Sequence, residues 1–310
     1  MSRDYIILPI FFLSSSLWAG NVSALKAEAI IGAEAANEGQ FKYQVSIQVH
    51  KRHICGGGII ADKFVLTAAH CFINDLRRYV DLPYKVVAGT SDLSANSGVE
   101  VNGDMVYTLA RFAPPPYDND IAVLKVTKHY SVSSRISPLE FPLSQSLGLD
   151  RNPKLSKLDL PKPGNYYVGE QAVLVGYGYS EIRPRFDLYT QEIFGYTKTN
   201  HLLRRTQVRI LDKDVCNAEP SKYKLNAHKQ LCGRVIRDGS QVRGTCRGDS
   251  GSPLVINNTI IGVLSTGSTT CDDSDEATWY SRVSQFLRFI GNAVKDANRR
   301  SIRFDEIRQS

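Results

Sequence analysis

Three short segments of the chain each place one potentially reactive side chain among small residues. His70 ends the run Thr67-Ala-Ala-His70, Asp120 opens the run Asp120-Ile-Ala-Val-Leu, and Ser250 lies within Gly248-Asp-Ser250-Gly-Ser. A serine hydroxyl is a weak nucleophile at neutral pH, so it needs an imidazole to take its proton and a carboxylate to orient that imidazole. Taken singly, each residue is typical of a structural site, a turn or a loop. Taken together, they predict nucleophilic catalysis by an activated serine.

These segments are far apart in the sequence, so a sizeable folded core must bring them together. The chain has 310 residues, of which 42% are hydrophobic and 22% are charged. This composition excludes a disordered chain and a bundle of membrane helices. Lys and Arg outnumber Asp and Glu by 38 to 31, and the resulting net charge of +7 is not gathered in one long basic run. We therefore expect a globular protein that does not bind nucleic acid.

Short segments rich in Val, Ile and Tyr recur along the chain and are bounded by Gly, Asp, Asn or Ser. Many such segments, without helical patterns between them, predict an all-β sandwich or barrel. The strands that we expect cover residues 43–49, 63–67, 84–88, 121–126, 171–176, 206–211 and 259–265.

One helix is expected near the C-terminus, over residues 284–296. Its apolar residues have the spacing of one helical face, and Ser284 is placed to cap its start. These apolar residues are Val283, Phe286, Leu287, Ile290 and Val294. A basic tail follows the helix, and we expect it to be solvated.

The proline-containing stretch 138–169 is expected to connect two halves of the fold. It is too long for a compact loop, so part of it is predicted to be an exposed insertion.

The N-terminus has the pattern of a secretory signal peptide over residues 1–24, with cleavage expected after Ala19 or Ala24. A retained membrane anchor is the weaker alternative, because an anchor needs about 20 apolar residues and this stretch is interrupted by Pro9 and three serines. Residues 25–29 would then be a short propeptide, and residues 30–310 the folded domain. A signal peptide implies a secreted, extracellular protein.

The secretory route is oxidising, so the six cysteines predict three disulfides rather than free thiols. The sequence pattern by itself leaves their pairing open. No Cys-x-x-Cys pair or closely spaced Cys/His set is present in the sequence, so we expect no zinc site and no other metal. The cysteines are Cys55, Cys71, Cys216, Cys232, Cys246 and Cys271.

Several further motifs accompany the three reactive segments, which occur in the order His, Asp, Ser. They are Ile30-Ile-Gly-Ala, Cys55-Gly-Gly-Gly-Ile-Ile, Gly176-Tyr-Gly and Tyr280-Ser-Arg-Val. With these motifs, the chain from Ile30 to about Ala293 resembles the chymotrypsin/trypsin family of serine endopeptidases, and in particular secreted chymotrypsin-like proteases of invertebrates. The resemblance implies two antiparallel six-stranded β-barrels packed face to face, a C-terminal α-helix, and an active site in the cleft between the barrels.

The resemblance also implies a role for each reactive residue. Ser250 would attack the peptide carbonyl, His70 would act as general base and then as general acid, and Asp120 would orient His70. The backbone N–H groups of Gly248 and Ser250 would form the oxyanion hole, and Ser265 would donate a hydrogen bond to Asp120. No cofactor is implied.

The cysteine pairing is likewise taken from the resemblance. It implies the disulfides Cys55–Cys71, Cys216–Cys232 and Cys246–Cys271. The first disulfide would cross-link the loop that carries His70, and the third would link the Ser250 loop covalently to the wall of the substrate pocket.

Activation would depend on a new N-terminus at Ile30. In this family a freed amino group pairs with the aspartate before the catalytic serine, here Asp249, so the resemblance implies a zymogen. The preceding residue is Ala29 and not Arg or Lys, which departs from activation by a trypsin-like protease. Three interpretations stay open: an activator of another specificity, a cut at Lys26 followed by trimming, or a chain that is never activated.

The pocket positions implied by the resemblance carry no charge. Gly244 would lie at the pocket floor, so the carboxylate that would bind a substrate Arg or Lys is missing. Gly267 would leave the entrance open, while Thr278 would exclude a large aromatic ring. We expect a preference for apolar residues of small or medium size, either chymotrypsin-like or elastase-like. The predicted pocket residues are Gly244, Thr245, Ser265, Thr266, Gly267 and Thr278.

Two departures from the family pattern concern the surroundings of the site. Ser252 replaces a glycine and Thr266 replaces an aromatic residue, but neither removes a catalytic group.

The acidic run 272–276 is expected to be a solvated loop. The alternative is that one of its carboxylates points inward, toward the substrate pocket. Asn257-Asn-Thr259 is a glycosylation motif beside an expected hairpin.

The partners expected from the resemblance are protein or peptide substrates, an activating protease and protein inhibitors. We expect a monomer that has no contact with membranes after the signal peptide is removed. The alternative from another class is a catalytically silent family member that acts as a binding or regulatory protein. A lipase or esterase is disfavoured because Gly248-Asp-Ser250-Gly lacks the Gly-x-Ser-x-Gly spacing.

Overall fold

The computed structural model describes residues 33–73, 79–112, 117–126, 166–179, 201–218, 225–237, 244–267 and 276–296, and the backbone of two further strands over 181–186 and 193–198. The predicted signal peptide and propeptide, Ile30, most of the 138–169 connection and the basic tail lie outside the described residues. The acidic run 272–276 also lies outside them, except for its exposed last residue, Glu276.

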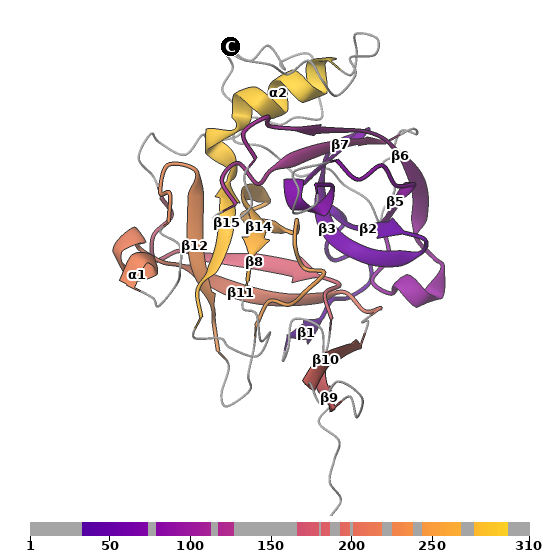
Figure 1. Ribbon diagram of the computed structural model, residues 1–310, viewed down its shortest axis with the longest axis horizontal. Coiled ribbons are helices and arrows are strands. Elements are labelled where there is room, and N and C mark those ends of the chain that lie inside the picture. The colour runs from indigo at the N-terminus through magenta and orange to yellow at the C-terminus, as the bar shows by residue number, and fades with distance from the viewer. Residues whose placement is uncertain are drawn as a thin grey trace, which may run out of the picture.

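The N-terminal half forms a closed antiparallel barrel of six strands (Figure 1). The chain runs around it in the order β2 (Gln44–Val49), β3 (Arg52–Ala61), β4 (Phe64–Thr67), β7 (Ala122–Val126), β6 (Val99–Thr108) and β5 (Tyr84–Ala88). Side chains such as Val45, Ile47, Val65 and Val86 are fully buried in its interior. These are β-branched residues that suit a pleated and buried surface, which explains why the segments form strands.

The C-terminal half forms a second antiparallel barrel. Its six strands are β8 (Gln171–Gly176), β11 (Arg204–Ile210), β12 (Gln230–Val235), β15 (Thr278–Arg282), β14 (Thr259–Thr266) and β13 (Pro253–Ile256). The pairing of β11 with β8 closes the ring, and the short strand β1 (Glu34–Ala35) adds to β11. Strands β9 (Glu181–Phe186) and β10 (Ile193–Lys198) form a separate antiparallel ribbon.

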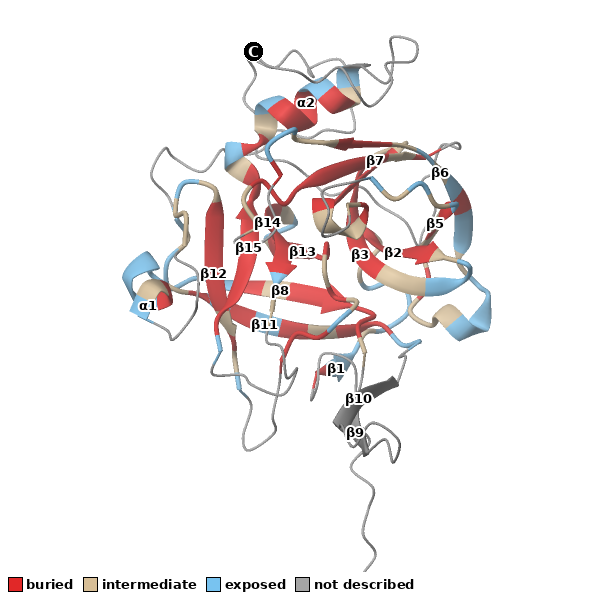
Figure 2. Ribbon diagram, in the orientation of Figure 1, coloured by how far each residue is buried: buried red, intermediate tan, exposed pale blue. Residues whose placement is uncertain are grey.

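Helices are few among the described residues. α2 (Leu287–Asp296) packs Phe289, Ile290 and Ala293 on a core that also contains residues of both barrels, and Figure 2 shows its buried face directed toward the strands. The other helical elements are short: α1 (Lys213–Ala218) and the 3₁₀ turns η1 (Ala69–Cys71), η2 (Leu93–Ala95) and η4 (Val283–Gln285). None of the described helices has the length and apolar character needed to cross a membrane.

The predicted start of the C-terminal helix was wrong by three residues. Residues 283–285 form the 3₁₀ turn η4, and the α-helix begins only at Leu287. Ser284 therefore lies within the turn, and its buried hydroxyl has no hydrogen-bond partner among the described residues instead of capping the helix. The apolar spacing extends across both elements because each buries residues, such as Val283 and Ile290, in the same core.

The expectation of an all-β fold of two barrels with a C-terminal helix is confirmed. Each of the seven expected strands is present within two residues of its predicted bounds. The sequence patterns missed both ten-residue strands, β3 and β6, and β3 contains Gly56, Gly57 and Gly58, a composition untypical of strands. Gly57 is needed because a Cβ atom there would lie only 2.6 Å from Val65 Cγ1 on the neighbouring strand.

Backbone hydrogen bonds join the two barrels along a seam. Leu93 N donates to His201 O at 2.8 Å, and Leu203 N donates to Ser91 O at 2.7 Å. The hydroxyl of Tyr177, from the second barrel, donates to Thr90 O at 2.5 Å. This seam holds the barrels in a fixed relation, so loops from both can contribute to one site.

Candidate active site

His70 lies directly after β4, in the 3₁₀ turn η1. The two alanines before it are completely buried, so only small side chains fit at these positions. The Cys55–Cys71 disulfide ties the turn to β3, and Thr67 Oγ1 donates to Gly56 O at 2.8 Å. These contacts position the imidazole, whose side chain is 23% exposed and thus accessible to a substrate.

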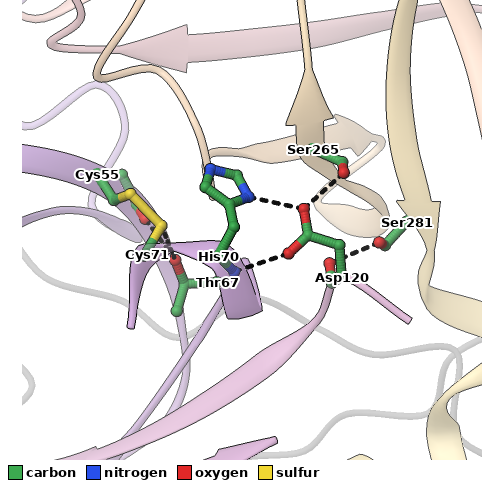
Figure 3. Close-up of polar contacts among 8 residues, drawn as sticks. Cys55, Thr67, His70, Cys71, Asp120, Ser265 and Ser281 are labelled. Atoms are coloured by element: carbon green, nitrogen blue, oxygen red, sulfur yellow. Dashed lines mark hydrogen bonds and ion pairs between the residues drawn. A yellow bond between two sulfur atoms is a disulfide. The ribbon is translucent and has the colours of Figure 1, made fainter. Parts of the chain in front are cut away.

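Asp120 precedes β7 and is fully buried against His70 (Figure 3). One carboxylate oxygen, Oδ1, accepts the backbone N–H of His70 at 2.9 Å, and the other, Oδ2, lies 2.7 Å from His70 Nδ1. The hydroxyl of Ser265 donates to the same Oδ2 at 2.5 Å, as the family resemblance implied. Ser281 Oγ donates to the backbone carbonyl of Asp120 at 2.6 Å. A buried carboxylate with this many donors has a fixed orientation.

The contact with Asp120 sets the tautomer and the proton affinity of His70. A carboxylate only accepts hydrogen bonds, so Nδ1 carries the proton and Nε2 is left to accept one. Burial lowers the pKa of His70, but the charge and the hydrogen bond of Asp120 raise it more, so the pKa lies above its ordinary value of 6.5. The imidazole is thereby suited to act as a general base near neutral pH.

Ser250 lies in the loop before β13, against the segment that carries His70. Its backbone carbonyl accepts the N–H of Gly56 at 2.8 Å. Gly251 has a φ of +80°, and a Cβ atom there would lie 2.2 Å from Thr67 Oγ1, so the two segments pack closely. Among the described residues no hydrogen bond joins Ser250 Oγ to His70. The structure thus joins His70 to Asp120 by hydrogen bonds and holds Ser250 on an adjoining loop.

The predicted oxyanion hole has a defined backbone conformation. Gly248 has a φ of +96°, which favours glycine, and its carbonyl accepts a hydrogen bond from His53 Nε2 at 2.8 Å. His53 Nδ1 lies 2.8 Å from Ser46 Oγ, and burial lowers the pKa of His53 to about 4, so this histidine is neutral. Within the described part of the chain, the backbone N–H groups of Gly248 and Ser250 donate no hydrogen bond. Both remain able to bind an oxyanion.

Three of the predicted pocket residues, Thr245, Gly267 and Thr278, lie close together. Thr245 and Thr278 are buried, with their hydroxyl oxygens 3.4 Å apart. A Cβ atom at Gly267 would lie 2.0 Å from Thr245 Oγ1, so Gly267 packs closely against the Thr245 side chain. Gly244 is also buried, whereas Thr266 is exposed.

Two of the three implied disulfides are present in full, Cys55–Cys71 and Cys216–Cys232. Cys246 is disulfide-bonded as well, while Cys271, its implied partner, lies outside the described residues. Since Cys55 and Cys71 are oxidised, they offer no thiolate for a metal although their sulfur atoms lie near His70.

Asp249 is completely buried directly before Ser250. Its Oδ1 accepts the N–H of Gly178 at 2.9 Å, and its Oδ2 accepts the N–H of Cys246 at 2.9 Å. Burial raises the pKa of this carboxyl to about 7, although the two backbone hydrogen bonds oppose the shift. A buried acid of this kind favours a cationic partner. Ile30, the partner that the resemblance implies, lies outside the described residues.

Three further contributors to the site escaped the sequence analysis. The Tyr117 ring lies 5.7 Å from the His70 ring, measured between centroids, and Ser281 and His53 act through the hydrogen bonds given above. Tyr117 stands three residues before Asp120 and His53 two before Cys55, so their proximity to motif residues was the available signal. Ser281 lies within the motif Tyr280-Ser-Arg-Val, but the motif did not by itself indicate a contact with Asp120.

The two barrels and the hydrogen-bonded His70–Asp120–Ser265 set between them define a chymotrypsin-like protein. The family model called Trypsin matches residues 30–290, and the chain belongs to this family of serine endopeptidases. Granzyme M of Rattus norvegicus is 28% identical over 285 residues, covering 90% of this chain and 93% of the relative. Snake venom serine proteinase 12 of Crotalus adamanteus is 25% identical over 269 residues, covering 86% of this chain and 88% of the relative. The solved structure of HL collagenase has a TM-score of 0.63 at 25% identity and covers 86% of this chain and 98% of its own.

Proposed function

We propose that this serine endopeptidase is secreted, that it is made as a zymogen, and that it cleaves peptide bonds through an acyl-enzyme formed on Ser250. The observation that carries the proposal is the buried Asp120 carboxylate bonded to both the backbone and the ring of His70. A carboxylate held in this way leaves Nε2 of the imidazole free to take a proton from a hydroxyl group.

In the proposed mechanism Ser250 Oγ attacks the substrate carbonyl while His70 Nε2 takes its proton. The imidazolium that forms is stabilised by Asp120, which stays ionised. The N–H groups of Gly248 and Ser250 bind the oxyanion, and one such donor typically contributes about 2.7–4 kcal/mol to the transition state. His70 then protonates the leaving amine, and water repeats the sequence to release the acyl group.

The alternative is a silent family member, and it draws support from the absence of a hydrogen bond between Ser250 and His70 among the described residues. Hydrogen bonds of this type often tighten only when substrate binds, so we favour the enzyme. N-terminal sequencing of naturally processed protein, followed by labelling with an organophosphate, separates the two. Label on Ser250 supports the enzyme, and a chain that starts at Ile30 yet takes no label supports the silent homologue.

Activation is proposed to pair the new amino group of Ile30 with Asp249. In the precursor, the Asp249 carboxyl has a pKa of about 7 against an ordinary 3.8, so its ionised form costs folding free energy at higher pH. This cost is absent below about pH 4, where the group is protonated in both the folded and unfolded states, and it is complete above pH 7. The precursor should therefore gain stability when the charge is removed, but only at the higher pH.

We expect Asp249→Asn in the precursor to raise the melting temperature by several degrees at pH 8 and to change it little at pH 4. Thermal unfolding followed by circular dichroism at the two pH values provides the measurement. The same substitution in the processed chain should lower activity, because the amino group of Ile30 loses its counter-charge. An equal shift in melting temperature at both pH values would contradict this account of Asp249.

The specificity pocket is proposed to take uncharged residues of limited size. Gly244 supplies no carboxylate for a basic side chain, and Thr245 and Thr278 narrow the slot. After processing, peptide anilides that end in Ala, Leu or Phe should be hydrolysed faster than those that end in Arg. A measured preference for Arg would reject this model of the pocket.

Thr278→Gly should widen the slot and raise kcat/KM for the Phe anilide, relative to the Ala anilide, by about tenfold or more. Thr278→Ser keeps the hydroxyl and removes only a methyl group, so it should have a smaller effect. Steady-state kinetics on the three proteins give the comparison. If Thr278→Gly leaves the Phe-to-Ala ratio unchanged, Thr278 does not limit the size of the bound residue.

A further inference from the structure

The hairpin that joins β13 to β14 carries the motif Asn257-Asn-Thr259 at its tip. Ile256 and Thr259 are the last paired residues of the two strands, so Asn257 and Asn258 form the two-residue turn between them. Their φ values are +47° and +64°. A type I′ hairpin turn needs a positive φ at both positions, and asparagine is one of the residue types that tolerate it. The turn and the acceptor motif therefore require the same residue type at position 257.

The motif is accessible in the folded protein. Asn257 and Asn258 are exposed, and Thr259 is partly exposed. Within the described part of the chain, none of these three side chains forms a hydrogen bond or an ion pair. A large polar group attached to Asn257 Nδ2 would therefore displace no side-chain contact that the fold uses.

The tip lies at the opposite end of the hairpin from the proposed catalytic residues. Ser250 precedes β13, and Ser265 is the second-last residue of β14, so both belong to the open end of the hairpin. The four residues of β13 that separate Ser250 from the tip span about 13 Å. A group attached at the tip therefore starts well away from Ser250.

We propose that Asn257 carries an N-linked glycan in the mature protein, an inference that rests on the secretion proposed above. The sequence Asn-x-Ser/Thr is the acceptor motif of this modification, and a surface loop is its expected setting. Asn257 offers the only such motif between Ile30 and Ser310.

The sugar donor would be a lipid-linked oligosaccharide pyrophosphate of the secretory pathway. Asn257 Nδ2 forms a bond to C1 of the first sugar, while the bond between C1 and the pyrophosphate oxygen breaks. The lipid pyrophosphate leaves with the electron pair of that bond, and one amide proton passes to a base of the transferase. The modification is independent of the peptidase mechanism.

Asn258 provides a matched position that should stay unmodified. It is exposed, it lies in the same turn and it also has a positive φ. Two residues after it stands Ile260 instead of Ser or Thr, so it does not start an acceptor motif. A difference between the two asparagines therefore reports recognition of the motif and not mere exposure.

The test uses the full chain carrying Ser250→Ala, so that no self-digestion occurs, secreted from cultured animal cells under its own leader. The tryptic peptide 248–282 contains Asn257 and Asn258 as its only asparagines. Mass spectrometry of this peptide should show the added mass of a glycan. Release with an N-glycan amidase in ¹⁸O-labelled water should convert Asn257, and not Asn258, to a labelled Asp.

Four variants localise the modification. Asn257→Asp removes the acceptor nitrogen but tolerates the positive φ, and it should abolish the glycan, as should Thr259→Ala. Asn258→Asp makes the same chemical change one position later and should keep the glycan. Thr259→Ser keeps the hydroxyl and should also keep it. Thermal unfolding checks that each variant is folded.

The outcomes separate this proposal from the proposed secretion. A chain that reaches the medium with its leader removed and Asn257 unmodified overturns the glycan and leaves secretion standing. A chain that stays inside the cells with its leader intact overturns both. A glycan that persists in Asn257→Asp, or that is lost in Asn258→Asp but not in Asn257→Asp, also overturns the assignment to Asn257.

Discussion

Replacing the proposed nucleophile should lower kcat by about 10⁴- to 10⁶-fold, because Ser250→Ala removes the hydroxyl group on which we propose that the acyl-enzyme forms. What remains is the contribution of substrate binding and of the oxyanion donors. The Ser250 side chain makes no hydrogen bond to the described residues, so its loss should leave the melting temperature nearly unchanged. The measurement is hydrolysis of a peptide anilide by processed protein, together with thermal unfolding.

Ser252→Ala is the matched control, since it removes a hydroxyl from the same loop. Ser252 Oγ accepts a hydrogen bond from Gln44 Nε2 at 3.3 Å. Activity of this variant should stay within about tenfold of the parent. If Ser250→Ala retained more than about a hundredth of the activity, the nucleophile would have to be another residue.

Asp120→Asn should lower kcat by about 10⁴-fold at neutral pH, because an amide at this position can hold the wrong tautomer of His70. The pH profile should change as well. In the parent, the pKa of His70 lies above 6.5, so kcat/KM should fall as the pH drops through a midpoint above this value. Without the charge of Asp120 only the effect of burial remains, which lowers the pKa, and the midpoint should move to lower pH.

Ser265→Ala provides a graded comparison with Asp120→Asn. It removes one donor from Asp120 Oδ2 and leaves the carboxylate and its contact with His70 in place. We expect kcat to fall about tenfold and the midpoint pH of the fall in kcat/KM to shift only slightly. If kcat/KM fell with the same midpoint pH in the parent and in Asp120→Asn, Asp120 would not control the protonation of His70.

The sequence predicted the fold where local patterns and tertiary packing agree. The segments that became β5 and β8 each contain two valines among other apolar residues, and the structure places them as expected. β3 was missed because its glycines are selected by contacts with Val65 and Ser252, which come from other strands and loops. No local pattern records such contacts.

The candidate site was predictable where a motif surrounds each residue, as it does for His70, Asp120 and Ser250. The bond from Ser265 to Asp120 followed from the family resemblance. Ser281 and His53 could not be assigned a role, because their contacts join β15 and β3 to residues more than 150 positions away. The contact between the hydroxyl groups of Thr245 and Thr278 could not be predicted either, because it joins two segments 33 positions apart.

The location of the disulfides has a mechanical consequence for the enzyme. Cys55–Cys71 closes a loop within the first barrel, and Cys216–Cys232 joins α1 to a strand of the second. Neither crosses the seam, yet His70 and Asp120 belong to one barrel and Ser250 to the other. The alignment of these three proposed catalytic residues therefore depends on weak bonds and buried surface along that seam. Under mild denaturant, a slight displacement of one barrel relative to the other should abolish peptidase activity while each barrel is still folded.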